Sequence, residues 1–347
     1  MKEDFLPYCS KVPFDYRRAL GNMDAAAGIN RYKSDDGPSC GMRIAEVYTA
    51  AGLRYSVLLD RGMDIGMTSF RGIPMAFYAK NGLVRADYAM TNPNSFPYYF
   101  TAGLLSTCGL DNVGQQCESD GKVLPTHGTR TFLPAYEVCG TSETEKGEQV
   151  LRVKGKMRIA PIFGENILLV RELVSKAESS SIEIIDSIEN QGSLPYEYMI
   201  LYHINFGFPL VSPDSKVHTN HEEVRFFTKP GMQERPIPEP DLYRKFVPPQ
   251  KTFSEYVFEM RKVRDNTVNA EVENPILGVK AIVNCESKNL PCFTQWINLA
   301  EQDYVLGLEP GTHNPLGRRA AKENGGLVLL APGETKTHSV RITFETL

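Results

Sequence analysis

The sequence predicts an all-β protein built from large antiparallel sheets with few short helices. Residues 151–159, 182–189 and 339–344 alternate apolar side chains with charged or small ones. This period of two is typical of strands with one buried and one exposed face. Turn-forming pairs such as Asp36-Gly37 and Asn81-Gly82 recur along the chain, as expected where tight turns join many strands.

The same alternation defines the individual strands. The predicted buried faces carry Leu151, Val153, Met157 and Ile159 in the first run, Ile182, Ile184 and Ile188 in the second, and Val340, Ile342 and Phe344 in the third. Shorter strand-like runs lie at 54–59, 253–258 and 304–308. The chain is therefore expected to be mostly strand.

Helical signals are few. Residues 314–324 are predicted to form a short helix with Pro315 at its first position and Gly325 at its end. Residues 80–100 are rich in Tyr and Asn and favour a loop or a single helical turn. Residues 230–249, rich in proline and charge, predict a long surface excursion, because strand patterns resume after it.

The chain shows no internal repeat and no step in composition. We expect a single domain over residues 1–347, with residues 1–36 as an N-terminal extension packed on it. A formal charge of −4 and a pI near 6.0 argue against a nucleic-acid or anionic-membrane partner. The sequence gives no indication of the oligomeric state.

The N-terminal residues lack the apolar run of a secretory signal, and no apolar stretch approaches the roughly 20 residues that cross a bilayer. Seven cysteines are an odd number with irregular spacing, which favours reduced thiols over a disulfide framework. We therefore expect a cytoplasmic protein. Because no CxxC pair occurs, a structural zinc site is not expected.

Three short runs carry the residue types needed for proton transfer. They are Leu124-Pro-Thr-His-Gly128, Leu201-Tyr-His-Ile-Asn-Phe-Gly207 and Gly307-Leu-Glu-Pro-Gly-Thr-His313. Each lies beside a strand-like stretch and turn residues, where a β-scaffold presents side chains to a ligand. Imidazole and carboxylate together are the minimum set for moving protons at neutral pH.

Each of these residues also has a purely structural interpretation. His127 is compatible with a hydrogen-bonded structural histidine, although Gly128 after it would let a ligand approach the backbone. His203 shares a strand face with Leu201, so it is compatible with a satisfied core histidine. Glu309 is compatible with an ordinary exposed glutamate at a strand end.

Two polar turns add candidates for binding hydroxyl groups. Arg61 and Asp64 flank Gly62 and together offer a fork of donors and an acceptor. The alternative is an internal Arg61–Asp64 ion pair that stiffens the turn. Asn112, in the turn at 108–114, offers both a donor and an acceptor, and its alternative is turn chemistry alone.

In this order, the runs resemble the aldose 1-epimerase (galactose mutarotase-like) superfamily. They are more similar still to a divergent bacterial branch of uncharacterised aldose-epimerase-like proteins. The features that carry this resemblance are the segments 60–66, 71–74, 103–114 and 307–312. It extends from about Gly37 to the C-terminus and implies a supersandwich of large antiparallel sheets.

The resemblance also implies roles for the candidate residues. His127 matches a substrate-binding histidine, His203 the general acid toward the ring oxygen, and Glu309 the general base. His203 lacks the proline that follows the family's second histidine. The family's substrate-binding aspartate, which lies between that histidine and the glutamate, has no local match here.

The implied activity is interconversion of sugar anomers without a metal or other cofactor. Glu309 and His203 would be catalytic, and the sugar would be bound by His127, Arg61, Asp64, Asn112 and His313. We expect His127, His203 and Glu309 to converge on one open cleft, with Arg61 within reach of the same ligand.

Two alternatives remain open at this point. One is a different isomerase, epimerase or lyase acting on a modified sugar, with His127, His203 and Glu309 as ligands of a divalent metal. The other is a carbohydrate-binding protein without turnover.

Overall fold

A computed structural model of the chain describes residues 18–86, 96–226, 241–253 and 255–347. Almost all of its regular structure is antiparallel β-sheet, so the predicted fold class is confirmed. None of the helices among these residues has the length and apolar character required to cross a membrane.

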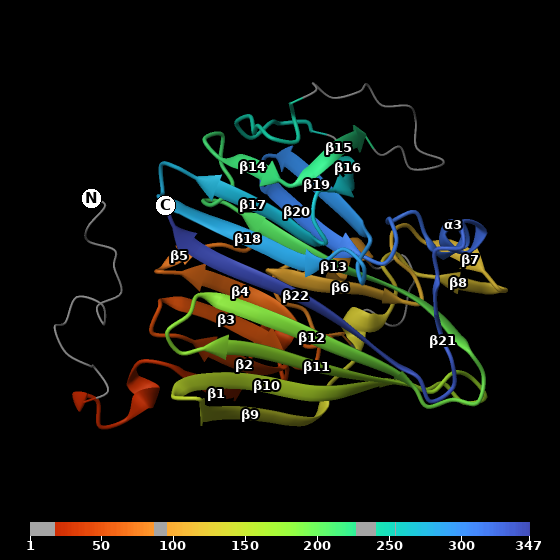
Figure 1. The fold of residues 1–347 in the computed structure, drawn as a ribbon, viewed down its shortest axis with the longest axis horizontal. Helices are drawn as coiled ribbons and strands as arrows, with labels where there is room; N and C mark the ends of the chain where they lie inside the picture. The colour runs from red at the N-terminus through yellow and green to blue at the C-terminus, as the bar shows by residue number, and fades with distance from the viewer. Residues whose placement is uncertain (1–17, 87–95, 227–240, 254) are drawn as a thin grey trace.

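Within the described residues, the larger sheet has twelve strands (Figure 1). Its main path, in spatial order, is β1 (Gly28–Lys33), β2 (Arg43–Tyr48), β3 (Leu53–Leu58), β4 (Asp64–Phe70), β6 (Leu105–Leu110), β13 (Tyr196–Gly207), β20 (Asp303–Gly311), β19 (Cys292–Ala300), β16 (Tyr256–Val263) and β15 (His221–Phe226). Two short strands pair beside this path, β5 (Ile73–Pro74) with β4 and β21 (Val328–Leu330) with β13.

The second sheet has eight strands in the same part of the chain. In spatial order they are β14 (Lys216–Thr219), β17 (Thr267–Asn274), β18 (Val279–Glu286), β22 (Thr335–Thr346), β12 (Ser181–Asn190), β11 (Ile167–Lys176), β10 (Glu148–Ile159) and β9 (Tyr136–Glu145). The predicted strands 151–159, 182–189 and 339–344 lie inside β10, β12 and β22.

The remaining elements are small. They are the hairpin of β7 (Cys117–Ser119) and β8 (Lys122–Leu124), the α-helices α2 (Phe96–Tyr99) and α3 (Arg318–Glu323), and the 3-10 helices η2 (Met23–Ala25), η3 (Gly37–Ser39) and η6 (Arg130–Phe132). The six cysteines in the described residues are unpaired.

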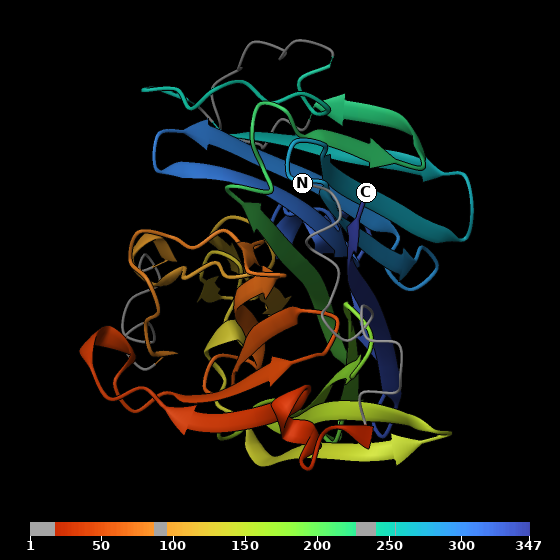
Figure 2. The ribbon, with the colours of Figure 1, turned by 90° about the vertical axis from the view of Figure 1, so that its left-hand side faces the viewer.

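The two sheets face each other and adjoin at their edges (Figure 2). At one edge β1 lies next to β9, and the Arg31 side chain donates a hydrogen bond to the carbonyl of Val138. At the other edge the chain passes from β14 to β15 through one residue, Asn220. One apolar cluster with members from both sheets fills the space between them.

The two faces of strand β13 lie in different surroundings. Its even-numbered residues, such as Tyr202 and Ile204, point into the core between the sheets. Its odd-numbered residues Leu201, His203 and Asn205 point to the opposite face, and they too are buried. His203 therefore lies on the face predicted from the period of two, opposite the core between the sheets.

The predicted helix at 314–324 is shorter in the structure. Pro315 precedes it, and α3 begins at Arg318 after Gly317. The reason is that Leu316 forms a bridge with Gly114, and the Gly317 amide donates to the carbonyl of Val113. These contacts hold the residues before Arg318 extended against the turn at 108–114.

Residues 1–36 are not simply an extension, because residues 28–33 form the edge strand β1 of the larger sheet. Residues 1–17 and most of the predicted excursion at 230–249 lie outside the described residues.

Candidate functional site

A cavity of about 390 Å³ lies over the face of the larger sheet that carries His203, and His127, His203 and Glu309 all line it. The structure thus brings together three residues from three distant runs of the sequence. Two histidines and a carboxylate on one cavity wall can exchange protons with a bound molecule.

The position of His203 and Glu309 follows from strand pairing. In the β13–β20 ladder Ile204 pairs with Leu308, which places His203 directly across from Glu309 on the same sheet face. His203 Nε2 lies 3.3 Å from Glu309 Oε1. The two residues are only 5% and 2% exposed. At this distance the imidazole and the carboxylate can pass a proton between them.

His127 sits in a strained turn. Its φ is +60°, a left-handed conformation that few residues other than glycine adopt. The turn is fixed because the His127 amide donates to the carbonyl of Gly114, and the His127 carbonyl accepts from the amide of Gly109. The Gly114 amide also lies 3.3 Å from His127 Nδ1 and donates to it. An accepting Nδ1 leaves Nε2 as the protonated nitrogen of a neutral ring.

The glycine after His127 has a different role from the one predicted. A side chain at Gly128 would lie 2.3 Å from Asp111 Oδ1, and Asp111 accepts hydrogen bonds from the amide and the hydroxyl of Thr129. The space at Gly128 is therefore filled by the protein, not left open for a ligand. Burial raises the pKa of the Asp111 carboxyl.

Aromatic rings surround the two histidines. The His203 ring lies 5.5 Å from Phe100, 5.5 Å from His127 and 5.3 Å from Trp296, measured between centroids. Phe96 lies 5.2 Å from His127. Aromatic walls exclude water and offer flat apolar faces to a ligand.

The cavity is also lined by residues with polar groups that the sequence analysis did not select, among them Lys80, Glu255, Trp296, Asn298 and Asp303. The Trp296 indole donates a 2.9 Å hydrogen bond to Glu255 Oε2. Lys80 Nζ lies 2.7 Å from Asp303 Oδ2, and this pair joins a loop to the start of β20. Each lies outside any recognisable motif. The one available signal was that Trp296 is the chain's single tryptophan, placed on the polar side of an alternating strand.

Arg61 is not among the residues that line the cavity. It is 2% exposed and donates to the carbonyls of Val84 and Tyr99, with its guanidinium 5.4 Å from the Phe132 ring centroid. Burial lowers its pKa to about 10, which leaves it charged at neutral pH. The guanidinium thus anchors α2, whose Phe96 is a cavity wall, instead of reaching a ligand itself.

Asp64 also lies outside the cavity, in a buried ionic network between the two sheets. Its Oδ1 lies 2.9 Å from Arg171 Nη1 and 3.4 Å from Arg130 Nη1. Both arginines also pair with Asp186. Asp64 therefore lies in the interior of the sandwich, away from the predicted sugar site, and its ion pairs are with these two arginines and not, as the structural alternative had it, with Arg61.

Asn112 and His313 are likewise absent from the cavity lining. The Asn112 amide donates to the carbonyls of Gln115 and Pro125, and its oxygen accepts from the amide of Arg318. His313 Nδ1 lies 2.8 Å from the carbonyl of the next residue. Asn112 is thus a turn residue, as its structural alternative proposed, and it ties the His127 turn to α3.

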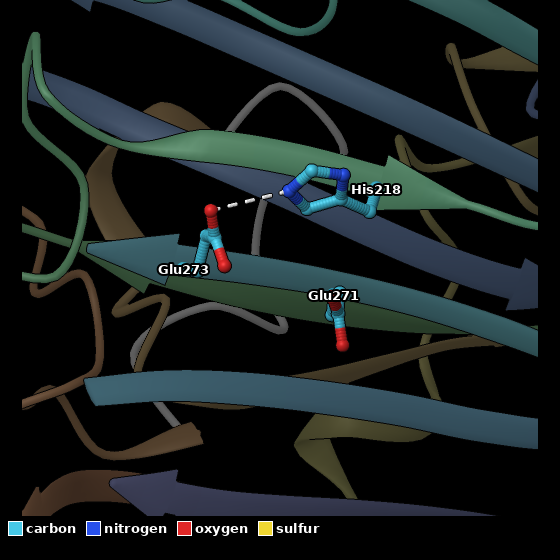
Figure 3. A group of neighbouring side chains, drawn as sticks. All are labelled: His218, Glu271 and Glu273. Atoms are coloured by element: carbon cyan, nitrogen blue, oxygen red, sulfur yellow. Dashed lines mark ion pairs between the residues drawn. The ribbon is translucent and has the colours of Figure 1, made fainter. Parts of the chain in front are cut away.

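The metal-binding alternative receives no support from the geometry. Among the described residues, one group of three has potential ligand atoms within 4.8 Å of one another, and it consists of His218, Glu271 and Glu273. Figure 3 shows this group on the neighbouring strands β14 and β17. None of its three residues lines the cavity. Lys280 pairs with Glu271, and His218 with Glu273, as in ordinary exposed cross-strand ion pairs.

Comparison with known families assigns the chain to a group without an established activity. Residues 39–344 match the family described as "Domain of unknown function (DUF4432)". The chain belongs to this family. A search of curated proteins found no match.

Solved structures identify the fold of this DUF4432 protein. A protein from Klebsiella pneumoniae, provisionally assigned as an aldose 1-epimerase, is similar over 98% of this chain and 90% of its own, with a TM-score of 0.81 and 18% identity. Galactose 1-epimerase from Lactobacillus acidophilus covers 92% of this chain and 99% of its own, with a TM-score of 0.58 and 13% identity. A galactose mutarotase-like protein from Clostridium acetobutylicum reaches 0.60 at 12% identity, over 93% of this chain and 100% of its own. The fold is galactose mutarotase-like.

Proposed function

We propose that this chain interconverts the anomers of a free sugar, with Glu309 as general base and His203 as general acid. The observation that carries the proposal is the contact of 3.3 Å between His203 Nε2 and Glu309 Oε1 on the wall of an aromatic-lined cavity. The similarity to aldose 1-epimerases supports the fold-level part of this proposal.

The reaction requires an acid and a base next to each other. Ring opening removes a proton from the anomeric hydroxyl and delivers one to the ring oxygen, and both oxygens are bonded to the same carbon. Glu309 would accept the first proton while protonated His203 donates the second. The two roles reverse when the ring closes on the other face. Each positioned group contributes on the order of 10²–10⁴-fold.

The other cavity residues are proposed to bind the sugar. His127, with Nδ1 occupied by the Gly114 amide, would donate from Nε2 to a sugar hydroxyl. Glu255 is a second carboxylate in the cavity, fixed by the Trp296 indole. We propose that Glu255 accepts hydrogen bonds from sugar hydroxyls, in place of the aspartate that the sequence did not reveal.

The test is anomeric exchange measured by NMR on a panel of aldoses, ketoses and uronates. Glu309→Gln keeps the shape and removes the base, so we expect kcat to fall by at least about 10²-fold with little change in sugar affinity. His203→Asn should behave similarly. His127→Ala should weaken sugar binding as well, because a hydroxyl-binding group acts in both the ground and transition states.

Full exchange activity in Glu309→Gln, measured beside wild type, would contradict the assignment. If wild type binds a sugar but exchanges the anomers of no member of the panel, the result would favour a carbohydrate-binding protein without turnover. Metal analysis of freshly purified protein tests the metal-assisted isomerase or lyase.

A further inference from the structure

The contact between His203 and Trp296 crosses a strand. His203 lies on β13 and Trp296 on β19, and β20 runs between them. Side chains on strands two positions apart do not normally meet, because the middle strand's side chains stand between them. Here the two ring centroids are 5.3 Å apart.

Gly307 on β20 removes the obstacle. In the sheet it lies directly between Asn205 of β13 and Trp296 of β19, on the face that carries the cavity. A side chain there would begin with a Cβ 2.5 Å from Glu309 Oε1 and 3.2 Å from Trp296 Cβ. The slot left by the missing side chain is therefore occupied by the Glu309 carboxylate on one side and the indole on the other.

Trp296 closes this slot in a fixed orientation. Its indole nitrogen donates to Glu255 Oε2 at 2.9 Å, which ties the ring to the start of the neighbouring strand β16. The ring edge then meets the His203 imidazole at an interplanar angle of 72°. The hydrogen bond to Glu255 limits rotation of the indole, and the contact between the rings limits rotation of the imidazole.

We propose that Gly307 and Trp296 are positioning residues for the His203–Glu309 pair. The glycine supplies the space that sets the place of the Glu309 carboxylate, and the tryptophan, held by Glu255, sets the orientation of the His203 ring. This inference rests on the proposed function for its kinetic consequence, but its geometric content does not depend on turnover.

Gly307→Ala is a selective probe. Gly307 has no left-handed φ, so alanine suits its backbone, and the nearest obstacle is the end of a flexible side chain. The added methyl should displace the Glu309 carboxylate. We expect kcat for anomeric exchange to fall on the order of 10²-fold, because misplacement of a reacting group by about 1 Å has an effect of this size. KM should change little.

The matched control is Gly140→Ala. Gly140 lies in strand β9, and its added Cβ would meet only ordinary contacts, the nearest at 3.4 Å from Ile29. This variant should retain wild-type kcat.

A second pair of variants separates the ring from its hydrogen bond. Trp296→Ala removes the wall beside His203 and should lower kcat strongly. Trp296→Phe keeps an aromatic ring beside His203 but loses the donor to Glu255, so its kcat should lie between those of wild type and Trp296→Ala, and sugar affinity, measured by calorimetry, should be reduced. Equal kcat in wild type, Trp296→Ala and Trp296→Phe would overturn the role of Trp296, even if Gly307→Ala failed to fold.

A spectroscopic readout keeps this test independent of turnover. The chain has six histidines, and the ring-nitrogen NMR signals of His203 are identified by their loss in His203→Asn. In Gly307→Ala the displaced carboxylate should shift the titration of His203 and leave that of exposed His218 unchanged. An unchanged His203 titration together with wild-type kcat in Gly307→Ala would overturn the proposal. Absence of exchange in wild type, with the shift present, would reject the proposed function alone.

Discussion

Arg61 shows how a residue can look like a ligand contact and prove to be part of the scaffold. It lies in a turn beside Gly62, and such turns usually face solvent. In the structure the turn is covered, because the Gly62 amide donates to the carbonyl of Leu133 and the Gly62 carbonyl accepts from Arg130. Local sequence indicates a turn but not what packs over it.

Arg61→Ala should destabilise the protein and weaken sugar binding indirectly. It removes two hydrogen bonds to carbonyls, from Val84 and Tyr99, and leaves both acceptors without this donor. We expect unfolding in urea, followed by circular dichroism, to show a loss of about 2–4 kcal/mol. Sugar affinity should fall because α2 and Phe96 lose their anchor. Wild-type stability with abolished affinity would instead place the guanidinium on the ligand.

The residues missed by sequence reasoning share a physical cause. Glu255, Trp296 and Asp303 come from separate strands or strand ends, and only the pairing of β16, β19 and β20 brings them to one cavity. His203 and Glu309 were recognisable because each stands in a motif of several residues. A carboxylate at an ordinary strand end carries no such local signal.

At the scale of elements, the period of two located the strands, but it carries no information on which strands pair. The alternation in β10, β12 and β22 depends on one face of each strand being buried, which is a local property. The order β13-β20-β19-β16, whose strands line the cavity, joins segments far apart in the sequence, since Leu201 pairs with Gly311 across 110 residues. The start of α3 was also misplaced, because contacts of Leu316 and Gly317 with the distant turn at 108–114 override the helix signal of Pro315.

The turn at 108–114 holds His127, and the Asn112 side chain links this turn to the neighbouring segments through its hydrogen bonds. Asn112→Ala would leave the carbonyls of Gln115 and Pro125 and the amide of Arg318 without their partner. We expect a destabilisation of about 2–4 kcal/mol in urea unfolding. We also expect weaker sugar binding by calorimetry, because Pro125 lies two residues before His127, with kcat at saturating sugar less affected.

Asn112→Asp serves as the matched variant, since it keeps the size and the acceptor but loses both amide donors. It should be destabilised nearly as much as the alanine variant. An Asn112→Ala protein with unchanged stability and reduced affinity would return Asn112 to the role of a direct sugar ligand.

At the scale of the whole molecule, the two sheets are joined by charge as well as by apolar packing. Asp64 belongs to the larger sheet, whereas Arg171 and Asp186 belong to the smaller one, and all are nearly inaccessible to solvent. Tyr202, which precedes His203, donates to Asp186 Oδ2 at 2.9 Å. The network therefore holds the back of the strand whose front carries the proposed acid.

Removal of one charge from this network should strongly destabilise the folded protein. Asp186→Asn keeps the shape but leaves Arg130 and Arg171 with Asp64 as their one remaining carboxylate in the network. Breaking a buried ion pair on one side destabilises proteins by about 3–5 kcal/mol. Unfolding in urea at pH 7 measures this difference.

The lowered pKa of Asp186 predicts how the stability of the protein falls in acid. Despite burial, the arginines lower the pKa of Asp186 from 3.8 to about 2. A pKa lowered by folding adds stability that is complete above the unfolded-state value and is lost as pH falls toward the folded-state value. The gap corresponds to about 2 kcal/mol, lost between roughly pH 4 and pH 2. Wild type should therefore lose about 2 kcal/mol more stability than Asp186→Asn when urea unfolding is repeated from pH 5 downward, so the gap between the two curves should narrow. Parallel curves would mean that Asp186 does not carry this charge in the folded protein.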